Sequence, residues 1–210
     1  MLDPAVLSFV LASLPPAPVR VLEVGAGEGE LAAALTAAGH DVVPIDPAST
    51  SEHVRPIRLH ELDGPPESFD AAVAVVSLHH VEPLGESCRR LADLVRRDGV
   101  LVLDEFDVAR LDERAAGWWL AHHEPSAHDE HEPGSAAEIV AWLRHHCHDL
   151  VQMEDALVEW FELGPPVRGP YLYRWARRVD LREDEERLIA AGQLPEVGIR
   201  LVGRRRPARA

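Results

Sequence analysis

A loop with a glycine at every second position follows the first strongly apolar run of the sequence. Residues 21–35 read VLEVGAGEGELAAAL, so an apolar run leads into Gly25-x-Gly27-x-Gly29 and then into an Ala/Leu-rich stretch. This order is that of a β-strand, a tight turn and a helix. Because glycines in such a turn let a ligand approach the backbone closely, the loop is a candidate site for a nucleotide or a nucleoside.

The spacing of the glycines and the charge of their neighbours disfavour a phosphate ligand. A dinucleotide-binding turn has G-x-G-x-x-G, and Glu30 stands where its third glycine belongs; no Gly-Lys-Ser/Thr follows, as a P-loop requires. Glu23, Glu28 and Glu30 would repel a pyrophosphate, whereas they suit a ligand with an ammonium and a sulfonium charge. The residues therefore favour S-adenosylmethionine, and a nicotinamide oxidoreductase is the disfavoured alternative.

The sequence around this loop alternates between expected strands and helices. The strands lack polar alternation, which is typical of a parallel sheet covered by helices on both faces. In such an α/β fold, ligands bind at the carboxyl ends of the strands, where the glycine loop lies. We expect strands at 19–24, 41–45, 54–59, 69–78 and 100–106, and helices at 31–38 and 84–97.

Capping residues mark the ends of further helices. Asp3 and Pro4 are typical of the start of a helix, and Pro15 and Pro16 end it. Ser135 is an expected N-cap, three residues before Glu138. Past residue 106 we expect helices at 107–123, 135–150 and 181–192, a strand at 158–163, a return at 169–176 interrupted by Pro and Gly, and a last strand at 196–204.

Four segments together resemble the class I S-adenosylmethionine-dependent methyltransferases, in their type-11-like branch that acts on small molecules. LEVGAGEG (22–29) resembles their E-x-G-x-G-x-G signature, and VVPIDPAS (42–49) resembles their second motif. SFDAAVAVVSLHHVEPL (68–84) is similar to their fourth-strand motif. LADLVRRDGVLVLDEFD (91–107) resembles the helix and strand that follow, with RDG at 97–99 in place of Pro-Gly-Gly. Segments 170–176 and 186–203 resemble the tail of an actinobacterial, hence bacterial, subgroup.

The resemblance implies a Rossmann-like doubly wound, mostly parallel sheet with helices on both faces and an antiparallel last strand. It also implies that Asp46 binds the ribose hydroxyls, as a bidentate charge-assisted acceptor. Glu23 would receive the ammonium group, and Glu61 with Leu62 is the preferred adenine site. Ser77 and Leu78 would border the sulfonium. The expected cofactor-binding residues are Glu23, Gly25, Ala26, Gly27, Asp46, Pro47, Glu61, Leu62, Ser77 and Leu78.

The expected reaction is in-line transfer of a methyl group from S-adenosylmethionine to an oxygen or nitrogen of a small molecule, leaving S-adenosylhomocysteine. His80, which matches a frequent family histidine, and His79 are candidate general bases, unless they only shape the loop. Asp104 and Glu105 are alternative acids on the same rim. A cofactor-binding protein of the same fold with a non-methylating or regulatory role stays an alternative, because its binding residues would be identical.

The composition of the chain disfavours some classes of binding partner. A net charge of −15 over 210 residues disfavours nucleic acid and anionic membrane surfaces, and no apolar run reaches the length of a membrane span. We expect a cytoplasmic protein, because the start of the chain lacks the cationic segment of a signal peptide. We also expect a monomer or a homodimer. The expected organisation is one methyltransferase domain at 1–210: a helix at 1–18, a cofactor core at 19–106, an acceptor-pocket insertion at 107–175 and a closing segment at 176–210.

Histidines and aromatic residues gather in the second half of the sequence. Histidines at 128, 131, 145 and 148 offer ligands suited to zinc, but their spacing fits no standard site, so we expect no metal. The preferred interpretation is a solvated or substrate-facing histidine cluster. Core packing or an aromatic lid over a flat acceptor would explain Trp118, Trp119, Trp142, Trp160, Phe161, Tyr171, Tyr173 and Trp175.

Overall fold

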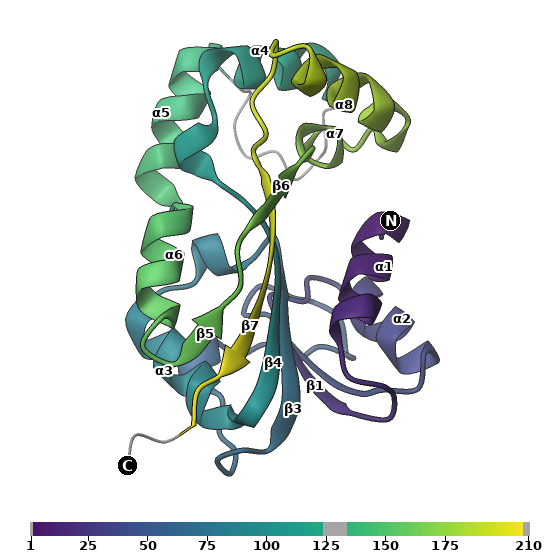
Figure 1. Cartoon of the computed structure of the whole chain (residues 1–210), viewed down its shortest axis with the longest axis vertical. Helices are drawn as coiled ribbons and strands as arrows, with labels where there is room; N and C mark the ends of the chain where they lie inside the picture. Colours follow the sequence, from purple (N-terminus) through teal and green to yellow (C-terminus); the bar gives the residue numbers. More distant parts are fainter. Residues whose placement is uncertain (1, 124–133, 208–210) are drawn as a thin grey trace. The chain divides into compact units, whose positions relative to one another are not determined.

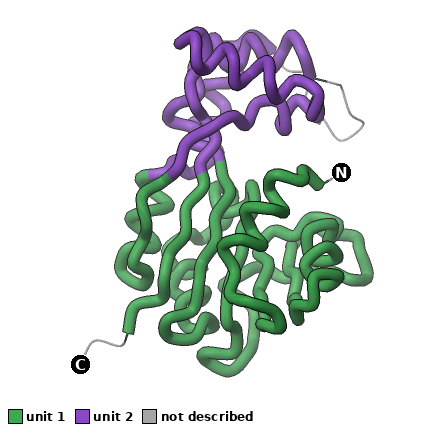
Figure 2. The backbone as a smooth tube through the Cα atoms, turned by 45° about the vertical axis from the view of Figure 1, so that its right-hand side comes forward, with its two compact units in different colours: residues 1–105, 151–166, 200–210 green, residues 106–150, 167–199 purple. Residues whose placement is uncertain are grey.

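The computed structural model describes residues 2–123 and 134–207, which form two compact units (Figure 2). The first unit contains Met1–Glu105, Val151–Pro166 and Arg200–Ala210, and the second contains Phe106–Leu150 and Val167–Ile199. Each unit is therefore built from separate stretches of the chain. The expected single methyltransferase domain over 1–210 stays a prediction. Within residues 2–123 and 134–207, no helix has the length and apolarity needed to cross a membrane.

A mixed sheet has the strand order β2-β1-β3-β4-β7-β5, and β6 pairs with β7 (Figure 1). Strand β1 runs parallel to β2 and β3, β3 runs parallel to β4, and β5 runs antiparallel to β7. The predicted α/β class, with its antiparallel last strand, is confirmed. The strands are β1 Arg20–Val24, β2 Asp41–Ile45, β3 Phe69–Val75, β4 Val95–Phe106, β5 Phe161–Leu163, β6 Val167–Gly169 and β7 Gly198–Arg205.

Helices cover both faces of this sheet in the first unit, with α1 and α2 on one side and α3 on the other (Figure 1). The helices are α1 Pro4–Ser13, α2 Glu30–Ala37, α3 Leu84–Leu94 and α6 Leu150–Leu157, with 3-10 turns η1 Leu59–Glu61 and η2 Leu78–His80. Helix α1 begins as predicted, because the Asp3 side chain accepts the Ala5 amide at 2.8 Å. Val10 and Leu35 pack with Val73 in one apolar cluster, which anchors both helices to the sheet.

The second unit is mostly helical, with η3 Val108–Arg110, α4 Glu113–His122, α5 Ala136–His146, α7 Leu172–Trp175, η4 Val179–Leu181 and α8 Arg182–Ala190. The predicted capping box of Ser135 and Glu138 is present at the start of α5. Trp119 of α4 stacks on Trp175 of α7, with ring centroids 4.2 Å apart. The buried Glu185 carboxylate accepts the amides of residues 171–173, so it fixes the start of α7.

Several predicted elements differ from the structure; the helix expected at 107–123 is divided into η3 and α4, and the helix expected at 135–150 ends at His146. The strand expected at 54–59 is wrong: Arg55 forms only an isolated bridge with Ile45, and Pro56 has no amide to donate to a ladder. Helix α3 ends at Leu94, three residues before the expected end, because β4 already begins at Val95. The return expected at 169–176 is instead the end of β6 followed by the short helix α7.

Candidate functional site

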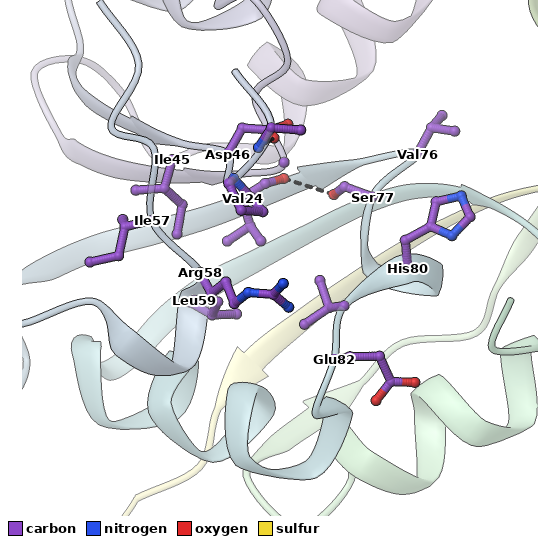
Figure 3. A pocket seen from close by; sticks show the side chains of 14 residues that line it. Val24, Ile45, Asp46, Ile57, Arg58, Leu59, Val76, Ser77, His80 and Glu82 are labelled. Atoms are coloured by element: carbon purple, nitrogen blue, oxygen red, sulfur yellow. Dashed lines mark hydrogen bonds between the residues drawn. The ribbon is translucent and has the colours of Figure 1, made fainter. Parts of the chain in front are cut away.

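A cavity of about 310 Å³ lies where β1, β2 and β3 end, within the first unit (Figure 3). This is the edge at which parallel sheets bind their ligands. Four segments form its walls: the end of β1, the turn after β2, the segment before η1, and the turn between β3 and α3. Its lining residues are Val24, Gly25, Ile45, Asp46, Pro47, Ala48, Ile57, Arg58, Leu59, Val76, Ser77, His80, Val81 and Glu82.

The glycine loop packs tightly against the turn after β3. Gly25 has φ +70°, and a Cβ built on it would lie 2.2 Å from the Ser77 Cβ. Ser77 Oγ donates a hydrogen bond of 2.7 Å to the Val24 carbonyl, drawn as a dashed line in Figure 3. The amides of Gly25 and Ala26 both donate to the Ile45 carbonyl. Position 25 therefore requires glycine for its backbone angle and for the contact with Ser77.

Asp46 follows β2 and is held by two backbone amides. Its Oδ2 accepts the Gly27 amide at 2.9 Å, and its Oδ1 accepts the Ala48 amide at 2.8 Å. The carboxylate is thus oriented before any ligand binds, and it lines the cavity. Each carboxylate oxygen has a further lone pair, so Asp46 can also accept two hydroxyl donors.

Glu23 lies behind the loop, on β1, and does not line the cavity. Its side chain is 3% exposed, and its Oε2 has no hydrogen-bond partner among the residues that the structure describes. Burial raises the pKa of this carboxyl to about 8; a backbone hydrogen bond from Ala32 opposes the rise, and the charge of Asp46 adds to it. A buried acid with an unpartnered oxygen is suited to a cationic partner, which would favour its ionised form.

His79 and His80, which are adjacent in the turn after β3, lie in different surroundings. His80 lines the cavity, whereas His79 is 2% exposed and its Nδ1 lies 2.7 Å from Oε2 of the buried Glu105. Their ring centroids are 4.1 Å apart, at an interplanar angle of 47°. His80 is therefore the one of the two that can reach a ligand in the cavity.

Comparison with known proteins gives the family. A family model described as a methyltransferase domain matches residues 4–152. The chain belongs to this methyltransferase family. It is 30% identical over 164 residues to the ubiquinone biosynthesis O-methyltransferase of Xanthomonas axonopodis, and 68% of each chain is covered. The corresponding enzyme of Rhodopseudomonas palustris is 30% identical over 99 residues, which are 40% of this chain and 39% of that enzyme.

Solved structures share the fold of this methyltransferase. A methyltransferase from an antibiotic biosynthesis pathway of Anabaena variabilis matches with a TM-score of 0.64 and 18% identity, covering 97% of both chains. The 1,6-didemethyltoxoflavin-N1-methyltransferase of Burkholderia thailandensis, solved with S-adenosylhomocysteine, matches with a TM-score of 0.56 and 20% identity over 97% of this chain and 76% of that one. The [4+2]-cyclase SpnF matches with a TM-score of 0.60 and 18% identity, over 98% of this chain and 82% of that one.

The predicted class of enzyme is confirmed: the chain is a class I S-adenosylmethionine-dependent methyltransferase. The residues present fit this cofactor on structural grounds. The Asp46 carboxylate is fixed and has free lone pairs, and among the described residues the buried Oε2 of Glu23 has no hydrogen-bond partner.

Not every predicted site residue of the methyltransferase lines the cavity. Gly25, Asp46, Pro47, Ser77 and His80 do; the others of the predicted set lie beside it or further away. In that second group are Glu23, Ala26, Gly27, Glu61, Leu62, Leu78 and His79.

The residues predicted for adenine, Glu61 and Leu62, do not line the cavity. Leu62 is buried and its carbonyl accepts the Arg90 guanidinium at 2.8 Å and 2.7 Å, whereas Ile57, Arg58 and Leu59 line the cavity. Without the strand expected at 54–59, the chain turns earlier, and no motif marks where. The predicted alternative acids Asp104 and Glu105 are both buried and do not line the cavity.

The late histidines of the methyltransferase pair with tryptophans one helical turn earlier. Trp118 stacks on His122, Trp119 on His123 and Trp142 on His146, each with ring centroids 4.4 Å apart. The candidate ligands at 128–131 lie outside the described residues. The i, i+4 spacing within α4 and α5 accounts for these stacked histidines as parts of helix faces.

Proposed function

We propose that this methyltransferase transfers a methyl group to an oxygen or nitrogen atom of a small-molecule acceptor. One observation supports this most directly: Gly25, Asp46, Ser77 and His80 surround a single cavity at the carboxyl ends of the strands. Its relatives in Xanthomonas and Rhodopseudomonas are named as O-methyltransferases, and one solved neighbour as an N1-methyltransferase. The net charge of −15 disfavours a nucleic-acid acceptor.

The cofactor-holding residues follow from the chemistry of the walls. Asp46 would accept the ribose hydroxyls, and the backbone at 25–27 would lie along the methionine part. Glu23 would face the ammonium group from behind the loop, directly or through water. Ile57 and Leu59 offer apolar side chains for the adenine, a wall that we prefer to Glu61 and Leu62 because it lines the cavity.

When bound, S-adenosylmethionine supplies a methyl group already activated on a sulfonium. The chain therefore has mainly to align the acceptor and exclude water. His80 is placed on the cavity wall, where a neutral imidazole can take the proton of an acceptor hydroxyl. His79 is buried against Glu105 and would act by holding the turn. A neutral amine acceptor needs no base before it attacks.

The direct test is transfer of label from methyl-labelled S-adenosylmethionine to a panel of small hydroxyl- and amine-bearing acceptors. The proposal expects label on at least one acceptor, with release of S-adenosylhomocysteine, and less transfer with the variant His80→Gln for hydroxyl acceptors. Saturable cofactor binding without transfer to any acceptor would instead favour a non-methylating role. This second function is tested because a solved structure of similar fold is named as a [4+2]-cyclase and not as a methyltransferase.

A further inference from the structure

Glu105, at the end of β4, contacts three consecutive residues of the turn that carries His80. We infer that Glu105 is a positioning residue, whose carboxylate fixes this turn and so sets the places of Ser77 and His80 on the cavity wall. The inference rests on the proposed function, since it assigns a task to the wall of the same cofactor cavity. It adds a residue that does not itself line the cavity.

The contacts of Glu105 use both of its oxygens. Oε1 accepts the amide of Ser77 at 2.8 Å and the amide of Leu78 at 2.6 Å. Oε2 lies 2.7 Å from Nδ1 of His79. Glu105 is 1% exposed, so these bonds form away from water, where bonds to a carboxylate are strong.

The turn needs such an anchor because its backbone is unusual. Val76 has φ +51°, a conformation in which a β-branched residue is strained. Its amide donates to the carbonyl of Asp104 at 2.8 Å, next to Glu105 in the chain. The first amides of η2 have no partner within that 3-10 turn, and the Glu105 carboxylate supplies one. Two consecutive residues of β4 therefore hold the strained turn in place.

The anchored turn reaches the cofactor loop as well as the cavity wall. Ser77 Oγ bonds to the Val24 carbonyl, and its Cβ occupies the space left by the missing side chain of Gly25. His80 lines the cavity three residues further on. If the bonds from Glu105 to the turn are lost, both the proposed cofactor-binding loop and the position of His80 must change.

The contact with His79 gives a spectroscopic signature. A carboxylate can only accept, so Nδ1 of a neutral His79 must carry the proton, and Nε2 must not. In Glu105→Gln, the amide oxygen can still accept from Ser77 and Leu78, but its NH₂ group then faces His79 Nδ1. The His79 proton should therefore move to Nε2 while the turn keeps its shape.

The experiment measures S-adenosylhomocysteine affinity by calorimetry, together with NMR of ¹⁵N-labelled histidine rings and of the 76–80 amides. Glu105→Ala should weaken S-adenosylhomocysteine binding by about tenfold or more and shift the signals of the 76–80 amides and the His80 ring. Glu105→Gln should keep the affinity within about twofold and move the His79 proton to Nε2.

Glu185→Ala is the matched control, because Glu185 is also a buried carboxylate that binds a turn; it accepts three consecutive backbone amides, where Glu105 accepts two. It should leave S-adenosylhomocysteine affinity unchanged.

Unchanged affinity and unchanged 76–80 signals in Glu105→Ala, or an equal loss of affinity in Glu185→Ala, would overturn the inference. If Glu105→Ala does not fold, a His79 proton that stays on Nδ1 in Glu105→Gln overturns it. Failure of the proposed function is distinguishable, since the wild type itself would then not bind S-adenosylhomocysteine, while the ring and amide signals would still report the anchor.

Discussion

Gly25 and Ser77 approach each other so closely that a methyl group on Gly25 would lie 2.2 Å from the Ser77 Cβ. Gly25 follows β1 and Ser77 follows β3, which are neighbours in the sheet. The first glycine of the loop is therefore required by packing between two strand ends, in addition to any approach of a ligand. A change at either residue is expected to disturb both.

Replacing Gly25 with alanine should abolish measurable binding of S-adenosylhomocysteine. The added Cβ would force Ser77 away and would also strain the backbone at φ +70°. We expect a loss of stability of about 2–4 kcal/mol, measured by urea unfolding. Gly192→Ala is the control: Gly192 has φ +68° but nothing within 4 Å of its would-be Cβ, so it tests strain alone. Equal effects of the two variants on binding would contradict the packing argument.

Asp46→Asn should lower S-adenosylhomocysteine affinity by about 10- to 100-fold. The amide removes the charge from the proposed bonds to the ribose and can no longer accept from both Gly27 and Ala48. Calorimetry measures the change. Asp41→Asn alters an exposed acid at the opposite end of β2 and should leave the affinity as it is. An affinity for Asp46→Asn within a factor of about two of the wild type would remove Asp46 from the proposed ribose site.

Glu23 should make the stability of the protein fall as the pH rises. Its folded-state pKa of about 8 lies above the ordinary value of 4.5, so between these values the native state holds a proton that the unfolded state has released. The free energy of unfolding therefore begins to fall near pH 4.5 and stops falling above about pH 8. Because Glu23→Gln has no proton to lose, its free energy of unfolding should exceed that of the wild type by up to about 5 kcal/mol at high pH, but by little at low pH. Urea unfolding at about pH 5 and about pH 8.5 measures the difference. A pH-independent difference would show that the carboxyl does not retain its proton.

Cofactor binding should couple to the same proton. If the ammonium group meets Glu23, the carboxyl ionises on binding and releases up to one proton near neutral pH. Calorimetry in buffers with different heats of ionisation counts the protons released. Glu23→Gln should bind more weakly and release none, whereas equal proton release by both proteins would place the ammonium elsewhere.

His80→Gln should lower kcat for a hydroxyl acceptor by about 100-fold or more, because the variant lacks the proposed general base. The affinity for S-adenosylhomocysteine should change by no more than about threefold, since glutamine fills similar space. Steady-state kinetics with an acceptor found in the labelling panel gives kcat and KM separately. An unchanged kcat would mean that the acceptor loses its proton without His80.

The sequence predicts structure correctly where that structure depends on residues close together in the chain. The start of α1 follows from Asp3 and Pro4, and the start of α5 from Ser135 and Glu138, because capping bonds span only two or three residues. The glycine loop and Asp46 were placed correctly at one edge of the sheet, because parallel strands bring their carboxyl ends together.

Features that depend on distant residues were not predictable in the same way. Glu105 bonds to residues 26 to 28 positions earlier in the chain, and Glu185 to residues 12 to 14 positions earlier; neither spacing forms a motif. Its position at the end of a predicted strand places Glu105 on the cavity rim, whereas in the structure it is buried among its partners. No motif predicts that residues 57–59 line the cavity, because the segment at 54–59 has the composition of a strand while Pro56 prevents a ladder from forming there.

The most direct test of the central claim is calorimetric titration of the wild-type protein with S-adenosylmethionine and S-adenosylhomocysteine, and separately with a nicotinamide dinucleotide. The acidic side chains of Glu23 and Asp46 at the glycine loop predict saturable binding of both adenosyl ligands at one site per chain, and no binding of the dinucleotide. Tight binding of the dinucleotide, with no heat from either adenosyl ligand, would contradict it.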